Sequence, residues 1–210
     1  MARRLGIMGG TFDPIHMGHL VTAEQARVDV GLDEVVFVPA GAPWQKSGGR
    51  AVSAGEHRYL MTVLATAANP FFSVSRIEID RGGPTYTVET LRSLRASLTD
   101  TELFFITGAD AILNILTWKD AGEAVDLASF VAATRPGYDL AALEEHDLTR
   151  QVTLLDVPAL AISSSDVRAR FEAGRPVRYL IPREVEEFAR KHGLYGTHGQ
   201  GLAAADVGVS

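Results

Sequence analysis

Cysteine is absent from the chain, and so is any apolar run long enough to cross a membrane. Without cysteine the protein can form neither a disulfide framework nor a cysteine-ligated zinc site, which fits a cytoplasmic setting. Arg3 and Arg4 are followed by only a short apolar segment, because Gly9 and Gly10 interrupt it. No secretory signal peptide and no membrane partner are therefore expected.

Positive charge is also scarce. The 210 residues include 26 acidic and 20 basic side chains, for a formal net charge of −6. An acidic chain lacks the broad electrostatic footprint that nucleic-acid binding needs, so no nucleic-acid partner is expected. Any polyanionic ligand must be met by a local positive site.

Apolar runs alternate with helical patterns along the chain, which is typical of a parallel sheet covered on both faces. We expect a Rossmann-like α/β fold, with an open parallel sheet and helices on both faces. One domain is predicted over residues 1–195, and the Gly- and Ala-rich residues 196–210 are predicted to be a disordered tail. Residues 139–151 are interpreted as a charged surface excursion. The predicted strands are 5–8, 35–38, 72–79, 103–107, 130–134 and 152–157.

Three helices are predicted from capping and spacing. Ser53 and Glu56 form a capping-box pattern, and Pro182 lies in the first turn of a final helix that runs towards Gly193. Two apolar stripes at helical spacing are interpreted as core. They are Leu60, Val63, Leu64 and Ala67 in the first helix and Val88, Leu91, Leu94 and Leu98 in the second.

The most informative stretch follows the first predicted strand and reads GGTFDPIHMGH, from Gly9 to His19. Glycines at a strand-to-helix turn let the backbone approach a ligand, and the N–H groups at a helix start favour anions. His16 and His19 lie three residues apart, so both can donate hydrogen bonds to phosphate on one side of the helix. Surface or capping roles are the alternative for both histidines.

Two other interpretations of this stretch are disfavoured. A zinc site would need a third ligand at a recognisable spacing from the histidines, and none is present, so no protein-bound metal is predicted. The GxGxxG fingerprint of dinucleotide-binding enzymes is absent, because Thr11 and Phe12 follow the two glycines. A hydride-transferring enzyme is thus not the favoured class.

Loops that follow the other predicted strands carry polar residues as well. The carboxyl ends of parallel strands meet at one edge of the sheet, where ligands bind. In 163–168, three serines precede Arg168 by about one helical turn. They can cap a helix or face phosphates, while Arg168 can hold two phosphate oxygens with its planar fork. Lys46, beside Trp44, is either a solvated lysine or part of an arm that closes over phosphates.

The GGTFDPIHMGHL segment resembles the signature of the HxGH nucleotidyltransferases, and ISSSDVR at 162–168 resembles their second signature. Together with PTYT at 84–87, TGAD at 107–110 and Trp118, the chain resembles the bacterial nicotinate mononucleotide adenylyltransferase family. The resemblance covers roughly Leu5 to Tyr195. It implies transfer of the adenylyl group of ATP to nicotinate mononucleotide, with Mg²⁺ carried on the ATP phosphates.

The resemblance also implies roles for individual residues. Catalytic stabilisation is assigned to His16, His19, Lys46 and Arg168. ATP binding is assigned to Gly9, Gly10, Thr11, Phe12, Ser163, Ser164 and Ser165. Acceptor binding is assigned to Thr85, Tyr86, Gly108, Asp110, Trp118 and Arg135.

Within the acceptor set, Trp118 would stack on the pyridine ring, with a core position as the alternative. Thr85 would receive the carboxylate and Asp110 would bind ribose hydroxyls, whereas Arg135 could meet a phosphate or merely flank a turn. The alternatives for the whole protein are an adenylyltransferase acting on nicotinamide mononucleotide or another acceptor, and a nucleotide-binding regulator without turnover. A homo-oligomer remains an open expectation.

Overall fold

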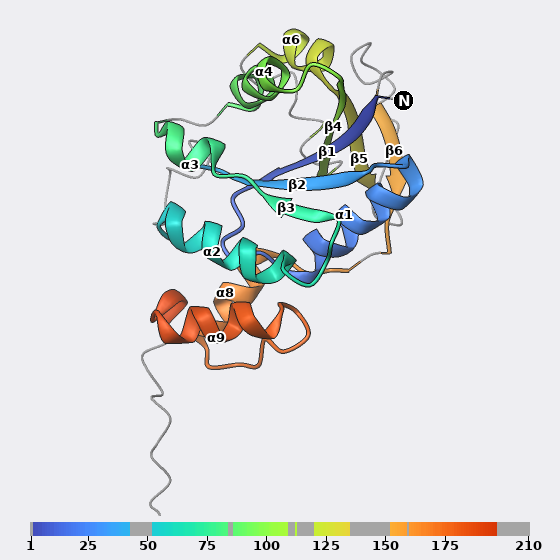
Figure 1. The fold of residues 1–210 in the computed structure, drawn as a ribbon. Helices are drawn as coiled ribbons and strands as arrows, with labels where there is room; N and C mark the ends of the chain where they lie inside the picture. Colours follow the sequence, from blue (N-terminus) through green and yellow to red (C-terminus); the bar gives the residue numbers. More distant parts are fainter. Residues whose placement is uncertain are drawn as a thin grey trace, which may run out of the picture.

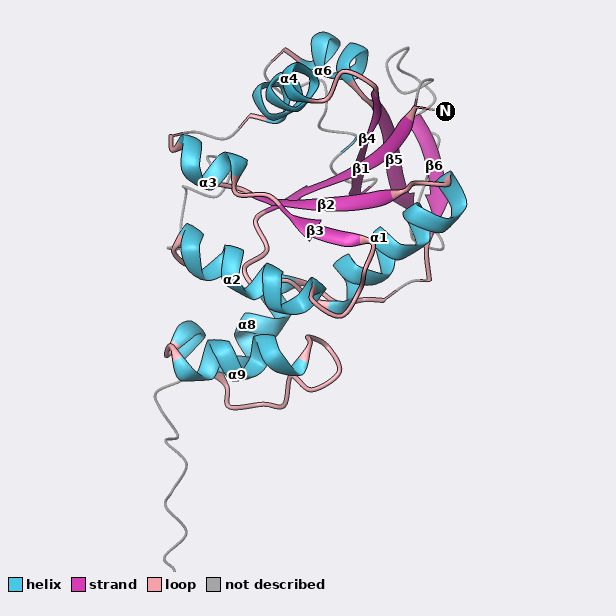
Figure 2. Cartoon of the chain, viewed as in Figure 1, coloured by secondary structure: helices cyan, strands magenta, loops and turns pink. Residues whose placement is uncertain are grey.

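The structure is a computed structural model that describes residues 2–42, 52–83, 86–108, 112, 120–134, 152–158 and 160–196. Six strands form one parallel sheet in the order β3-β2-β1-β4-β5-β6 (Figures 1 and 2). The order reverses between β1 and β4, which places the first strand at the centre. The strands are β1 (Arg3–Gly10), β2 (Glu34–Pro39), β3 (Phe72–Val74), β4 (Thr101–Gly108), β5 (Ser129–Thr134) and β6 (Val152–Asp156).

Helices cover both faces of this sheet, as predicted (Figure 2). On one face lie α1 (Met17–Val30), α2 (Gly55–Thr66), α8 (Ser164–Glu172) and α9 (Arg183–Lys191), followed by a short 3₁₀ turn, η4 (Leu194–Gly196). On the other face lie α4 (Thr87–Ser97) and α6 (Ala121–Leu127). The short α3 (Ile77–Arg81) follows β3.

Alternation along the strands divides the buried residues between two clusters. In β2, Val35 and Phe37 pack under α1 and α2, whereas Val36 and Val38 pack under α4. Because both faces are covered, the central strands read as continuous apolar runs, which is why their positions were predictable.

The third predicted strand is too long. The ladder of β3 ends at Val74, and residues 77–79 belong to α3 instead. The hydroxyl of Ser75 accepts a hydrogen bond from the backbone N–H of Ile77 at 3.2 Å, which turns the chain out of the strand. The strand was predicted to extend to residue 79 because Ile77 and Ile79 are apolar. The local hydrogen bond from Ile77 to Ser75 favours a helix there instead.

The predicted core stripe of α2 is also wrong. Leu60 and Leu64 are 37% and 36% exposed, and Ala67 is exposed too. The buried face of the helix consists of Arg58, Met61, Thr62 and Thr66. No side-chain cap is present: the helix begins after Ala54, and Ser53 contributes its backbone N–H and carbonyl to other partners. The capping-box prediction therefore fails.

The other two helices are present as predicted, except that Pro182 precedes the first turn of the last one instead of lying in it. Val88, Leu91 and Leu94 are buried on α4, and Leu98 packs beside them. Pro182 is the N-cap of α9, one position before the first turn. No helix of the described residues is long and apolar enough to span a membrane. The predicted excursion at 139–151 and residues 197–210 of the predicted tail lie outside the described residues.

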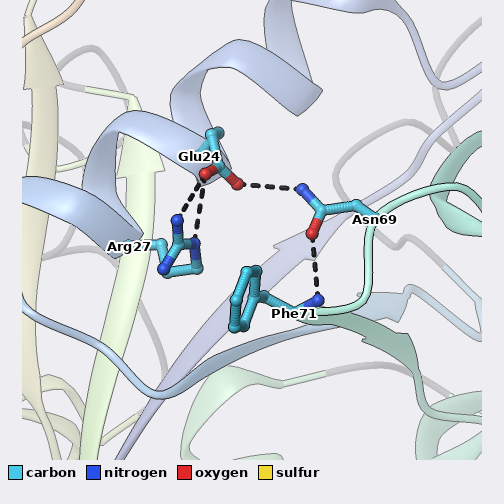
Figure 3. Close-up of polar contacts among 4 residues, drawn as sticks. All are labelled: Glu24, Arg27, Asn69 and Phe71. Carbon is cyan, nitrogen blue, oxygen red and sulfur yellow. Dashed lines mark hydrogen bonds and ion pairs between the residues drawn. The ribbon is translucent and has the colours of Figure 1, made fainter.

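A polar network fastens α1 to the turn before β3 (Figure 3). Glu24 accepts from Arg27 at 2.6 Å and from the Asn69 amide at 2.9 Å, and the Asn69 oxygen accepts the Phe71 N–H. The Arg27 guanidinium lies 4.2 Å from the centre of the Phe71 ring. Hydrogen bonding to Arg27 is the main cause that lowers the pKa of the Glu24 carboxyl. The network fixes the far end of α1, away from its histidines.

Candidate active site

A cavity of about 350 Å³ lies at the carboxyl ends of the strands, beside the point where the strand order reverses. Its walls come from the end of β1, the start of α1, the ends of β4 and β5, and the segment that leads into α8. This is the position at which open parallel sheets bind ligands. The predicted site residues among its lining are His16, His19, Gly108, Ser163, Ser164 and Ser165.

The turn between β1 and α1 is tightly built. A Cβ atom at position 10 would come within 2.7 Å of the Phe12 ring, so glycine is required there. Phe12 itself is buried and has φ 50°, a left-handed conformation that a bulky residue rarely adopts. The Gly10 carbonyl accepts the Ala40 N–H at 2.8 Å, which joins the turn to the end of β2. Contacts around the buried Phe12 ring stabilise this strained backbone conformation, as is common beside functional sites.

The two histidines lie against each other. His16 is the N-cap of α1 and His19 lies in its first turn, with ring centroids 3.7 Å apart and planes 24° from parallel. Gly18 leaves room for this arrangement, because a Cβ there would lie 3.1 Å from the His16 ring. The Nδ1 atom of His19 accepts the backbone N–H of His16 at 3.1 Å. In the neutral imidazole the proton of His19 is therefore on Nε2.

The three serines at the start of α8 have different partners. The Ser163 hydroxyl accepts the Asp166 N–H at 3.0 Å and caps the helix. Helix capping was one of the two roles considered for these serines from the sequence. The Ser164 hydroxyl donates to the Pro14 carbonyl at 2.9 Å. The Ser165 hydroxyl accepts from Arg168 at 3.0 Å. The last two contacts join α8 to the turn after β1 and to the arginine of the same signature.

Arg168 connects the two signatures of the sequence. Its Nη1 donates to the backbone carbonyl of Asp13 at 2.6 Å, and its Nη2 donates to Ser165. Its buried Nε has no hydrogen-bond partner within the described part of the chain. Segments about 150 residues apart in the sequence thus meet beside the cavity, although Arg168 itself is not one of the residues that line it.

A buried polar group behind this turn was not predicted. Arg58 is 1% exposed and donates to the carbonyls of Thr11, Gly41 and Ser53, while Asp13 accepts from Tyr195 and from the Ser53 N–H. Burial lowers the pKa of Arg58, against the opposing charge of Asp13. Burial, then the charge and hydrogen bond of Asp13, raises the pKa of the Tyr195 hydroxyl. No local sequence signal marks Arg58 or Tyr195, because their partners come from distant segments.

The remaining predicted residues are placed as follows. Gly9, Gly10, Thr11 and Phe12 form the end of β1 and the turn behind the cavity. Tyr86 is the N-cap of α4, where it packs against the apolar cluster under α4 and α6 rather than lining the cavity. Lys46, Thr85, Asp110, Trp118 and Arg135 lie outside the described residues.

A larger hollow, of about 850 Å³, lies between the start of α1 and α9 and is lined by Met17, Tyr179 and Arg183 among others. It contains none of the predicted site residues. No group of three or more His, Asp or Glu side chains that could hold a metal ion occurs within the described ranges.

Known proteins resemble this chain along most of its length. The cytidylyltransferase-like family model matches residues 7–170. A probable nicotinate-nucleotide adenylyltransferase of Clavibacter michiganensis is 60% identical over 194 residues, which cover 91% of this chain and 94% of the relative. One from Corynebacterium kroppenstedtii is 56% identical, covering 94% and 93%.

Solved structures give the same fold. The Plasmodium falciparum nicotinic acid mononucleotide adenylyltransferase complexed with NaAD has a TM-score of 0.78 at 19% identity, covering 93% of this chain and 98% of its own. At 19% identity this likeness establishes only the fold. The relatives at 56–60% identity establish the family. The chain belongs to the nicotinate-nucleotide adenylyltransferase family of cytidylyltransferase-like proteins.

Proposed function

We propose that this protein transfers the adenylyl group of ATP to nicotinate mononucleotide, forming nicotinate adenine dinucleotide and pyrophosphate, a step of NAD biosynthesis. The observation that carries the proposal is the joining of both signatures at one cavity, with Arg168 hydrogen-bonded to the turn after β1. The names of relatives at 60% identity support the acceptor, and the NaAD complex of the Plasmodium neighbour is compatible with it.

The reaction needs no nucleophilic side chain. The 5′-phosphate of the mononucleotide is ionised at neutral pH, so one of its oxygens attacks the α-phosphorus of ATP directly and pyrophosphate leaves. The protein must hold both phosphates in line and stabilise the charge that builds on them. Donors fixed before the reaction do this without reorganisation.

His19 is suited to such a role. Its Nδ1 accepts the His16 N–H, so in the neutral ring its Nε2 carries the proton and is the donor nitrogen. The ring is held between His16, stacked at 3.7 Å, and Phe12, edge-on at 5.1 Å. We assign His16 and His19 to stabilisation of the α-phosphate.

Arg168 and the start of α8 would meet the outgoing pyrophosphate. The first N–H groups of this nine-residue helix lie at the cavity wall with Ser164 and Ser165. The hydroxyl hydrogen of Ser164 is directed to Pro14, so its contribution to ATP binding would come through the backbone. Lys46 would add a second cation over the phosphates.

Magnesium is proposed to enter as part of MgATP. No carboxylate or histidine cage is found within the described residues, and Mg²⁺ commonly keeps several waters while bound to substrate phosphates. The substrate complex would carry the ion in and pyrophosphate would carry it out.

The acceptor would lie on the β4 side of the cavity, where Gly108 ends the strand. We assign stacking on the pyridine ring to Trp118, carboxylate binding to Thr85 with its neighbour Tyr86, and ribose binding to Asp110. For Arg135, after β5, contact with a phosphate and a place beside a turn are both still open.

The test is an assay of the purified protein with MgATP and either nicotinate or nicotinamide mononucleotide. Donors placed for a carboxylate face an amide N–H₂ in the wrong substrate, at a cost of about 3 kcal/mol, so kcat/KM should favour nicotinate about a hundredfold. Trp118→Ala should raise the acceptor KM and leave the ATP KM unchanged. Release of no pyrophosphate with any mononucleotide would instead indicate a nucleotide-binding regulator.

A further inference from the structure

Arg58 is the most deeply buried charged side chain among the described residues, and every hydrogen bond that it donates goes to a backbone carbonyl. Its Nη1 reaches Thr11 at 2.8 Å, its Nη2 reaches Gly41 at 2.9 Å and its Nε reaches Ser53 at 2.9 Å. These carbonyls belong to the segment after β1, the segment after β2 and the residue pair before α2. One guanidinium thus joins three segments at the ligand-binding edge of the sheet.

The charge of Arg58 is balanced by Asp13 through Ser53. Ser53 gives its carbonyl to Arg58 and its N–H to Asp13 Oδ2, at 3.3 Å. The other carboxylate oxygen of Asp13 accepts from the Tyr195 hydroxyl at 2.7 Å. The backbone carbonyl of Asp13 in turn accepts from Arg168. Continuous contacts therefore run from Arg58 to Arg168.

The direction of the Thr11 carbonyl determines the direction of an amide. In a trans peptide the C=O and the following N–H point in opposite directions. Arg58 draws the Thr11 carbonyl towards α2, so the N–H of Phe12 points away from α2. Phe12 holds a strained left-handed φ of 50°, which persists only when neighbouring contacts over-determine it.

Stability alone does not explain a buried arginine at this position. Burying a guanidinium is costly, and apolar side chains of similar volume often serve a core as well or better. On the same buried face of α2, Met61 fills space and Thr62 and Thr66 bond only to carbonyls of their own helix. Arg58 differs because all three of its acceptors lie outside the helix.

We propose that Arg58 is a positioning residue for adenylyl transfer, which fixes the turn of residues 11–14 and, through Asp13, the attachment point of Arg168. The inference rests on the proposed function. It predicts that weakening Arg58 impairs the handling of ATP more than that of the acceptor, because both the turn and Arg168 serve the phosphates of ATP.

The test compares Arg58→Lys with Thr66→Val. Lysine keeps the charge but has one nitrogen in place of a three-branched fork. Thr66→Val removes a buried hydroxyl from the same helix without touching the turn, and so controls for lost stability. For each folded variant we would measure the melting temperature, the KM of both substrates, kcat, and the Kd of MgATP by calorimetry without acceptor. Assays are run at least 10 °C below the lower melting temperature.

Arg58→Lys should lower kcat about tenfold or more and weaken MgATP binding at least threefold, with the acceptor KM within about twofold of the parent, because small displacements of catalytic groups have effects of this size. Thr66→Val should keep parental kcat although it melts earlier. Equal kcat in both variants would overturn the proposal.

If Arg58→Lys does not fold, a second variant can still test the proposal. Tyr195→Phe removes the hydroxyl that donates to the Asp13 carboxylate, midway along the same contacts, and it should lower kcat about threefold with the acceptor KM unchanged. Parental kcat in Tyr195→Phe, with no folded Arg58 variant, would also overturn the proposal. A parent protein that binds MgATP but forms no dinucleotide would refute the proposed function instead, and the Kd comparison would still test Arg58.

Discussion

The two faces of the sheet are built by different rules. Under α4 and α6, apolar side chains such as Leu91, Leu103 and Phe105 pack together, and the buried carboxylate beside them, Glu78, accepts a hydrogen bond from Thr90 of α4. Under α1, α2 and α8, the apolar cluster continues into Asp13, His16 and Arg58, all less than 8% exposed. The first face holds the sheet together, while the second also holds the turn at which ligands are expected.

This difference shows where a protein benefits from burying polar groups despite the free energy lost when they leave water. An apolar contact tolerates a small shift, whereas a hydrogen bond to a particular carbonyl fixes both position and direction. The polar groups of the second face lie behind the carboxyl ends of β1 and β2, next to the cavity. Substitutions in the apolar cluster under α4 and α6 should therefore affect stability alone, whereas substitutions of the polar groups that hold the turn after β1 should also affect turnover.

The largest effect on turnover is expected for His19→Ala. A fixed donor to transition-state charge is worth about 3 kcal/mol, so kcat should fall about a hundredfold with little change in the ATP KM. His192→Ala is the matched control, because His192 is an exposed residue that contacts Phe188 at the end of α9. Steady-state kinetics of both variants check this, and an unchanged kcat in folded His19→Ala would remove this side chain from the mechanism.

Leu91→Ala tests the apolar face. The side chain is fully buried on α4, so its truncation should lower the free energy of unfolding by about 3 kcal/mol. Urea denaturation measures that loss, and kcat/KM well below the melting temperature should equal that of the parent. Leu64→Ala, at an exposed position of α2, should lower stability by less than about 1 kcal/mol. A large loss of kcat in Leu91→Ala would erase the distinction between the faces.

Arg168→Lys should have a smaller effect than loss of His19. The ammonium retains the charge but cannot bond both Asp13 and Ser165 as the planar fork does. We expect kcat/KM for ATP to fall about tenfold, measured beside Arg170→Lys, whose parent residue pairs with Asp166 on the surface of the same helix. Equal values for the two variants would mean that Arg168 acts only as a point charge.

The sheet and the meeting of the two signatures were predictable from local pattern. Buried parallel strands such as β2 are continuous apolar runs, and strand ends of a parallel sheet share an edge, so short motifs placed the cavity. The signatures themselves come from the resemblance to a family. Their residue roles stay predictions.

What could not be predicted depended on distant partners. The face of α2 was misassigned because Leu60 and Leu64 have helical spacing, yet Arg58 and Thr62 are the buried side chains. An arginine is buried only where carbonyls happen to converge, and those of Thr11, Gly41 and Ser53 do so only after folding. Tyr195 likewise meets Asp13 across 182 positions of the chain.

Tyr195→Phe is expected to have a small effect on stability, and the size of that effect depends on pH. At pH 8 the hydroxyl donates to Asp13, and its loss should cost about 1 kcal/mol. Burial raises the pKa of Tyr195 above its ordinary value, so the unfolded chain loses this proton first as the pH rises.

The contribution of Tyr195 is thus complete below about pH 10, where an unperturbed tyrosine titrates, and is lost as the pH rises beyond it. The stability difference between the parent and Tyr195→Phe should shrink from pH 8 to pH 11, as measured by urea denaturation of both proteins. Other ionisable groups titrate equally in both chains and cancel in the difference. A difference that stays constant or grows above pH 10 would mean that the hydroxyl is not held, protonated, against the Asp13 carboxylate. In that case the turn after β1 would have to be fixed by Arg58 and Arg168 alone.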